Sequence, residues 1–125
     1  MKVIGYTRVS TDEQGRSGLG LAAQRRALED QALAKGWEVT WMSDEGASGK
    51  NLARPALQRA LAALKAGEAE ALVVAKLDRL SRSMQDFTNL LQTAMKQKWA
   101  LVALDVGMDT TTPSGELVAH VMASV

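Results

Sequence analysis

The sequence predicts an α/β domain in which a mainly parallel β-sheet is flanked by helices on both faces. Short runs of apolar and β-branched residues alternate along the chain with longer segments whose apolar residues recur every three or four positions. Such an alternation of strands and helices is typical of parallel sheets with helical connections. The 125 residues, of which 46% are hydrophobic and 23% charged, suffice for one domain with one core.

The first half of the chain predicts two strands joined by a helix. Residues 2–9 are rich in β-branched and apolar side chains, as expected of a buried strand. Residues 12–20 are polar and rich in glycine, which indicates a loop. A helix should end at Gly36, since glycine is favoured directly after a last helical turn. The predicted elements are a strand over 2–9, a loop over 12–20, a helix over 21–35, a strand over 38–42 and a loop over 43–51.

The second half predicts two more strands and three helices. Pro55 fits the first position of a helix, where its missing N–H costs nothing, and Gly67 should end that helix. Residues 71–75 form a continuous apolar run, as in a strand covered on both faces. The remaining predicted elements are a helix containing Met84, Phe87, Leu91 and Ala94, a fourth strand over 99–106, and a last helix that Pro113 opens.

Polar side chains follow three of these strands and should meet at one edge of the sheet. Ser10 follows the first strand, residues 44–48 follow the second, and residues 78–82 follow the third. In open parallel sheets, sites form beyond the carboxyl ends of the strands. We therefore expect the chemistry of this protein at that edge.

Ser10 and Arg8 form the most informative pair. Alone, Ser10 would be interpreted as a cap of a turn or helix. In an extended segment, however, positions 8 and 10 point to the same side. A guanidinium beside a serine hydroxyl favours attack on a phosphate, because the cation binds the phosphate oxygens. No histidine lies near in sequence, so an acyl-transfer triad is not predicted.

A second basic group lies at residues 76–82. Arg79 and Arg82 are three positions apart and would share a face if a helix begins there, while Asp78 is suited to orient an arginine or to move a proton. Lys76 alternates with Asp78 along the strand. The alternative is a solvated surface turn with internal ion pairs.

A third polar group combines Asp44, Glu45 and Ser48 with Arg54. Loop polarity alone would explain the two carboxylates. Arg54 precedes a proline and is therefore held in an extended backbone, which suits a side chain that reaches back to a site. By default, Gln14 and Gln24 are interpreted as surface residues.

Composition excludes several classes of protein. There are no cysteines, so thiol catalysis and thiolate metal sites are ruled out, and a single histidine, His120, cannot form a histidine cluster. The net charge of +1 predicts that any contact with DNA depends on a few placed arginines. No apolar run approaches the roughly 20 residues that span a bilayer. A cytoplasmic location without membrane contact is the default expectation.

Together, these motifs resemble the catalytic domain of the serine recombinases, the resolvase and invertase family of site-specific DNA recombinases. The resemblance covers nearly the whole chain. It rests on Tyr6-x-Arg8-Val9-Ser10-Thr11-x-x-Gln14, Gln24, Ser48-Gly49 with Arg54, Leu77-Asp78-Arg79-Leu80-x-Arg82, and Thr112-Pro113-Ser114-Gly115.

The resemblance implies a function and a set of site residues. Ser10 would attack a DNA phosphodiester, become joined to the 5′ phosphate and release a 3′ hydroxyl, with no metal, ATP or other cofactor. Arg8, Arg79 and Arg82 would bind the scissile phosphate and, with Asp78, would be the catalytic partners of Ser10. The residues expected to bind the substrate are Tyr6, Gln14, Gln24, Ser48 and Arg54.

The resemblance also carries expectations about the whole protein. Val125 would lie inside the last helix of the catalytic domain, and a DNA-binding domain would follow outside this chain. The implied partners are double-stranded DNA and further copies of the protein, as a homodimer and a synaptic homotetramer. Two other classes stay open: an α/β regulatory binding module, and a phosphoesterase with Ser10 as nucleophile.

Overall fold

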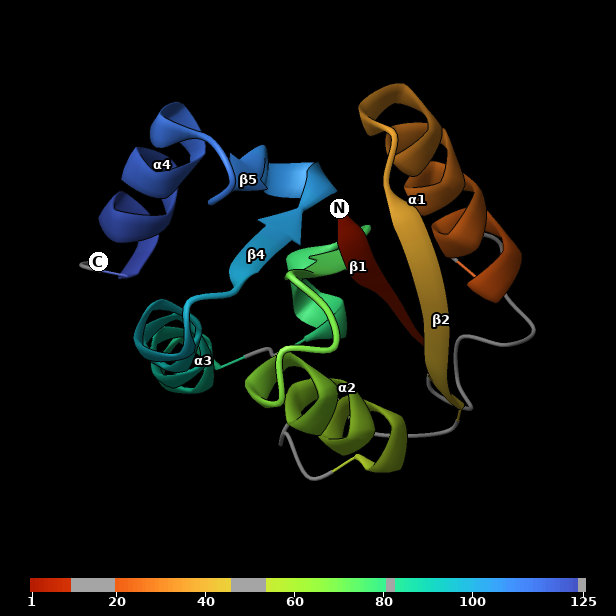
Figure 1. Ribbon diagram of the computed structural model, residues 1–125, viewed down its shortest axis with the longest axis horizontal. Helices are drawn as coiled ribbons and strands as arrows, with labels where there is room; N and C mark the ends of the chain where they lie inside the picture. Colours follow the sequence, from red (N-terminus) through yellow and green to blue (C-terminus); the bar gives the residue numbers. More distant parts are fainter. Residues whose placement is uncertain (10–19, 46–53, 81–82, 124–125) are drawn as a thin grey trace.

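The core of the molecule is a five-stranded sheet with the strand order β2-β1-β3-β4-β5. The computed structural model describes residues 1–9, 20–45, 54–80 and 83–123 (Figure 1). Neighbouring strands are parallel except β5, which runs antiparallel to β4. The strands are β1 (Lys2–Val9), β2 (Glu38–Glu45), β3 (Ala71–Val74), β4 (Ala100–Ala103) and β5 (Met108–Asp109).

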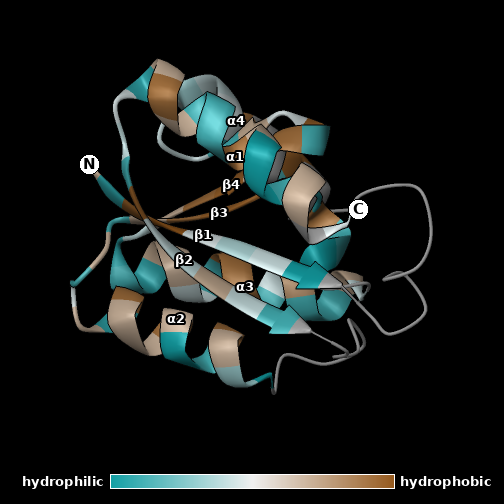
Figure 2. Cartoon of the chain, turned by 90° about the vertical axis from the view of Figure 1, so that its right-hand side faces the viewer, coloured by the Kyte–Doolittle hydropathy of each residue, from teal (hydrophilic) through white to brown (hydrophobic). Residues whose placement is uncertain are grey.

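Helices cover both faces of this sheet, which confirms the predicted fold class (Figure 2). Helix α1 packs on one face, α2 and α3 pack on the other, and α4 contacts β5 and α3. The helices are α1 (Leu21–Lys35), α2 (Pro55–Lys65), α3 (Met84–Gln97) and α4 (Pro113–Ala123), with short 3-10 helices η1 (Leu77–Arg79) and η2 (Leu104–Val106).

Local sequence signals account for the helix boundaries. Gly36 follows α1 in the left-handed region with φ of 71°, and Pro55 takes the first turn of α2. The Ser83 side chain caps α3 by accepting a hydrogen bond from the Asp86 N–H at 3.3 Å. At the start of α4, a Cβ on Gly115 would lie 1.8 Å from the Asp109 carbonyl oxygen. Only glycine therefore allows α4 to approach β5 this closely.

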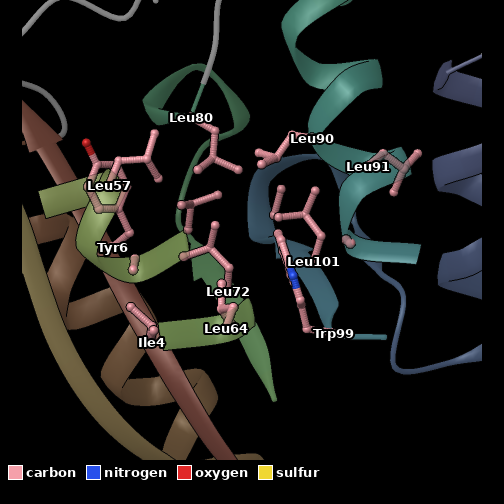
Figure 3. Packing of buried hydrophobic residues seen from close by; sticks show 14 of the residues in the cluster. Ile4, Tyr6, Leu57, Leu64, Leu72, Leu80, Leu90, Leu91, Trp99 and Leu101 are labelled. Atoms are coloured by element: carbon pink, nitrogen blue, oxygen red, sulfur yellow. The ribbon is translucent and has the colours of Figure 1, made fainter. Parts of the chain in front are cut away.

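The core has two layers that follow the alternation of the interior strands, and Figure 3 shows the layer on the side of α2 and α3. Ile4 and Tyr6 of β1 face α2 and α3, together with Leu72 of β3. Val3 faces the other layer with Leu28 of α1. Every residue of β3 is buried, as its continuous apolar run predicts.

Several predicted boundaries were wrong. Strand β2 extends through Glu45, so Asp44 lies in a strand and not in a loop. The fourth strand is shorter than the predicted range 99–106, because β4 covers only Ala100–Ala103 and a 3-10 helix follows. The chain then reverses into β5, which was not predicted. Thr110 supports this short edge strand, since its side-chain oxygen accepts the Leu101 N–H at 2.8 Å.

Candidate active site

Arg8 lies near the carboxyl end of β1, on the same face of this strand as Ile4 and Tyr6. Its side chain is fully buried. Its Nε donates a hydrogen bond to the Arg79 carbonyl at 3.3 Å, and its Nη2 donates to the Asp78 carbonyl at 3.2 Å. The guanidinium thus joins the end of β1 to η1, which follows the neighbouring strand β3.

The backbone of Arg8 is held separately by Gln24 of α1. Residue pairing between β1 and β3 covers only Val3–Gly5. Beyond it, the Gln24 side chain accepts the Arg8 N–H at 3.1 Å and donates to the Arg8 carbonyl at 2.9 Å. A buried primary amide therefore replaces a strand partner at this position. The default interpretation of Gln24 as a surface residue was wrong, since it is fully buried.

Arg79 and Asp78 belong to η1. Arg79 is only 5% exposed. Its Nε lies 3.4 Å from Asp78 Oδ1, and the Asp78 side chain is 46% exposed. The predicted alternative, a solvated surface turn, was therefore wrong for Arg79, although the internal ion pair that it assumed is present. Arg82 lies outside the described residues.

Arg54 reaches the same segment from the start of α2. Its side chain is 2% exposed. Its Nη1 donates to the Arg79 carbonyl at 2.8 Å, and its Nη2 donates to the Leu80 carbonyl. Burial is the main cause that lowers the pKa of Arg54. The guanidinium nevertheless stays charged at neutral pH, because arginine starts from a very high pKa.

Asp44 organises the base of the site. Its Oδ1 accepts the Ala56 N–H at 2.9 Å, and its Oδ2 accepts the Leu57 N–H at 3.1 Å. The Tyr6 hydroxyl also donates to Oδ2, at 2.8 Å. Asp44 thereby caps the start of α2, whose own N-cap residue, Arg54, provides no side-chain cap. Loop polarity does not explain this carboxylate, which is buried in β2.

Tyr6 remains a neutral phenol at this position. Burial is the largest cause that raises its pKa, and the hydrogen bond to Asp44 raises it further. The Tyr6 ring also lies beside Arg54, with 5.5 Å between the ring centroid and the guanidinium carbon. Tyr6 therefore connects the apolar core to the polar end of the sheet.

The cluster carries more positive than negative charge. Among the described residues, three buried guanidiniums (Arg8, Arg54 and Arg79) lie with two carboxylates (Asp44 and Asp78). Buried cations are costly unless they are paired, so such a group favours an anion. No cluster of metal-binding side chains occurs in the part of the chain that the structure describes.

The structure brings together six of the residues predicted for the site. The six are Tyr6, Arg8, Gln24, Arg54, Asp78 and Arg79. Ser10, Gln14, Ser48 and Arg82 lie outside the described residues. Lys76 precedes η1 and lines a depression with Asp78 and Asp105 beside α3. Asp44 was named in the third polar group but was not assigned to the site, because its contacts with the start of α2 reach across the chain and leave no local signal.

The fold and this basic cluster at the strand ends define an α/β protein with a positively charged site at one edge of its sheet, and comparison with known proteins identifies its family. The family described as "Resolvase, N terminal domain" matches residues 3–125. A DNA-invertase of Escherichia phage P1 is 39% identical over 123 residues, which are 98% of this chain and 59% of the invertase. The transposon Tn3 resolvase of Escherichia coli is 32% identical over 125 residues, covering 100% of this chain and 62% of the resolvase.

Solved structures agree. The N-terminal catalytic domain of TP901-1 integrase matches with a TM-score of 0.89 and 34% identity, covering 99% of this chain and 93% of that one. The chain therefore belongs to the resolvase N-terminal domain family, which confirms the predicted resemblance. It spans about three fifths of the length of the two curated relatives. None of the described helices is long and apolar enough to span a membrane.

Proposed function

We propose that this chain is the catalytic domain of a site-specific DNA recombinase with Ser10 as its nucleophile. The Ser10 hydroxyl would form a bond to a backbone phosphorus and lose its proton. The bond from phosphorus to the 3′ oxygen would break, and that oxygen would leave as a hydroxyl. The 5′-phosphoserine link keeps the ester bond, so the reverse attack by a 3′ hydroxyl rejoins the strands without ATP.

The observation that carries this proposal is the cluster of buried guanidiniums at the end of β1. Arg8 is two residues before Ser10, and its guanidinium contacts the backbone of the segment that contains Arg79. Phosphoryl transfer depends on fixed positive groups around the non-bridging oxygens, and such groups are strongest where water is excluded. Arg8, Arg79 and Arg82 take this role in the proposal.

The remaining site residues take supporting roles. Asp78 pairs with Arg79, and in the proposal it orients this arginine or exchanges a proton with the leaving oxygen. Tyr6 acts through Asp44, which it contacts directly. Gln14 and Ser48 are assigned to DNA binding by the family resemblance alone. Neither metal nor ATP takes part in the proposed reaction.

The proposal extends to the partners of the whole protein. Its substrate is double-stranded DNA, and two subunits would bind each recombination site and four would form the synaptic complex. Helix α4 offers a surface for assembly, because Leu117 and Val121 are 66% and 55% exposed. The names of the relatives support the DNA substrate, since they describe a DNA-invertase and a transposon resolvase.

Covalent capture tests the reaction. The full-length recombinase would be incubated with a nicked suicide DNA that loses the attacking 3′ hydroxyl after cleavage. A DNA adduct on the peptide containing Ser10 is expected, and Ser10→Ala should abolish it while DNA binding is retained. A phosphoesterase would instead release a free 5′ phosphate without an adduct. Adduct formation by Ser10→Ala would refute the assignment.

A further inference from the structure

We propose that Arg54 is a positioning residue that holds the segment 78–80 and does not bind DNA phosphate itself. The inference rests on the proposed function, because the segment matters through the role assigned there to Arg79. It differs from the expectation that the family resemblance gave for Arg54, which was substrate binding.

The contacts of Arg54 carry this assignment. Arg54 is 2% exposed, and the two terminal nitrogens of its guanidinium donate to the successive carbonyls of Arg79 and Leu80. Arg8 donates to the carbonyls of Asp78 and Arg79 through its Nε and Nη2, whereas Arg54 uses both of its terminal nitrogens for carbonyls. The two guanidiniums thus hold three successive carbonyls and share the middle one, that of Arg79. We call this arrangement the carbonyl clamp.

The geometry of η1 explains why these carbonyls need cations. The backbone hydrogen bonds of η1 run from Arg79 N–H to the Lys76 carbonyl and from Leu80 N–H to the Leu77 carbonyl. The next three carbonyls therefore lie at the carboxyl end of the short helix, where oxygens lack partners within the helix and positive charge is favourable. A planar fork can bind two of them at fixed spacing, whereas an ammonium cannot.

Arg54 is itself held in place by its neighbours in α2, β1 and β2. Its backbone starts α2, whose first N–H groups are bound by Asp44. Its guanidinium lies beside the ring of Tyr6. Asp44 and Tyr6 are joined by their own hydrogen bond. Arg54 therefore transmits the position of α2 and β2 to the backbone beside Arg79, and an error there would misplace the Arg79 guanidinium.

The test separates positioning from phosphate contact. In the full-length recombinase, Arg54→Met removes the fork and keeps much of the stem, and Arg54→Lys keeps the charge without the fork. DNA affinity is measured across salt concentrations, and adduct formation is measured in a single turnover at saturating DNA. Arg59→Met is the matched control, since Arg59 is exposed on the same helix.

We expect Arg54→Met to slow single-turnover cleavage by roughly 10- to 100-fold, the effect of a small misplacement at a reacting centre. The slope of log affinity against log salt should stay unchanged. A residue that neutralises a phosphate would instead lower this slope by about 0.9, and that result would overturn the proposal. Arg54→Lys should resemble Arg54→Met, whereas full activity of Arg54→Lys would show that charge alone suffices.

Two additions keep the test informative. Leu64→Ala removes core packing at the far end of α2, so it reports what lost stability alone does to cleavage. If both variants lost the same fraction of cleavage rate for the same lowering of Tm, the loss in Arg54→Met would follow from stability alone. That result would overturn the positioning role. Should Arg54→Met not fold, the charge-retaining Arg54→Lys carries the same measurements.

Hydrogen exchange examines the carbonyl clamp without any reaction. The Arg79 and Leu80 amides should exchange on the order of 10-fold faster in Arg54→Met, and amides of β3 should not change. The proposed function is tested separately, since a wild-type protein that forms no DNA adduct would refute it. The hydrogen exchange of Arg54→Met would still decide whether the carbonyl clamp exists. Unchanged hydrogen exchange of the Arg79 and Leu80 amides in Arg54→Met would refute the carbonyl clamp.

Discussion

The two ends of β1 lie in contrasting environments although they belong to one eight-residue strand. Ile4 belongs to the apolar cluster that Figure 3 shows, together with Leu64 of α2 and Leu72 of β3. Arg8, on the same face, is equally buried but is surrounded by polar backbone and charged groups. The apolar end is stabilised by removal of surface from water, whereas the polar end needs a specific partner for each buried group.

This difference shows what each end contributes. The apolar end tolerates hydrophobic substitutions that conserve volume, and its contribution is to the stability of the fold. The polar end depends on donor and acceptor geometry, and its described residues carry more positive than negative charge, which favours a bound anion. The following predictions test whether the two ends divide stability and catalysis in this way.

The largest effect is expected from lysine substitutions of the three arginines proposed to bind the scissile phosphate. Arg8→Lys, Arg79→Lys and Arg82→Lys each keep the charge but lose the planar two-donor fork. We expect single-turnover cleavage to fall on the order of 10²-fold or more, as for other donors that act in a transition state. Quantifying the covalent DNA adduct over time measures this. Wild-type rates in all three variants would contradict a phosphate-binding role.

At the apolar end, Leu72→Ala should affect stability instead. Leu72 is fully buried between the sheet and the helices, so truncation should lower the free energy of unfolding by about 2–5 kcal/mol. Urea unfolding followed by tryptophan fluorescence measures the loss. Cleavage assayed well below the Tm should remain near the wild-type rate. A large cleavage defect in the folded variant would break the proposed division between the two ends.

Asp44→Asn tests how much stability the polar end contributes. The substitution removes a charged acceptor and directs an amide towards groups that all donate to Asp44. We expect a loss of about 1–3 kcal/mol in the free energy of unfolding, as for a buried hydrogen-bonding group left unsatisfied. The matched control is Ser83→Ala, which removes the partly buried cap of α3 and should cost about 1 kcal/mol. A smaller loss in Asp44→Asn than in Ser83→Ala would contradict this account.

The smallest effect concerns the ionisation of Tyr6, the one tyrosine of the sequence. Burial and the Asp44 hydrogen bond raise the pKa of its phenol in the folded state. A raised pKa contributes stability that is complete below the unfolded pKa of about 10 and is lost as pH rises above it.

Ultraviolet difference absorbance of the phenolate can follow this titration directly. In the folded protein we expect no phenolate at pH values where free tyrosine is half ionised, and we expect its appearance to coincide with alkaline unfolding. Tyr6→Phe should remove the signal completely. A phenolate that forms near the ordinary tyrosine pKa while the protein stays folded would show that the Asp44 contact does not protect Tyr6.

The amino-acid sequence alone was enough to predict the parallel α/β architecture and the edge of the sheet where the polar groups meet. Apolar periodicity decided the strands and helices, because a buried strand such as 71–74 has the same pattern in any context. The distinctive motifs, from Tyr6 to Arg82, predicted the family, which comparison with known proteins confirmed.

Only the tertiary structure decided how the individual polar residues are used. In the sequence, Gln24 looks like any polar residue on the surface of a helix. Only the fold shows that its side chain binds the backbone N–H and carbonyl of Arg8. Asp44 looks like an ordinary polar residue of a loop. Only the fold shows that its carboxylate accepts the first N–H groups of α2. From the sequence, Arg54 is expected to contact DNA. Only the fold shows that its guanidinium donates to the carbonyls of Arg79 and Leu80, more than twenty positions away. These pairings join segments far apart in the chain, so local propensity carries no information about them.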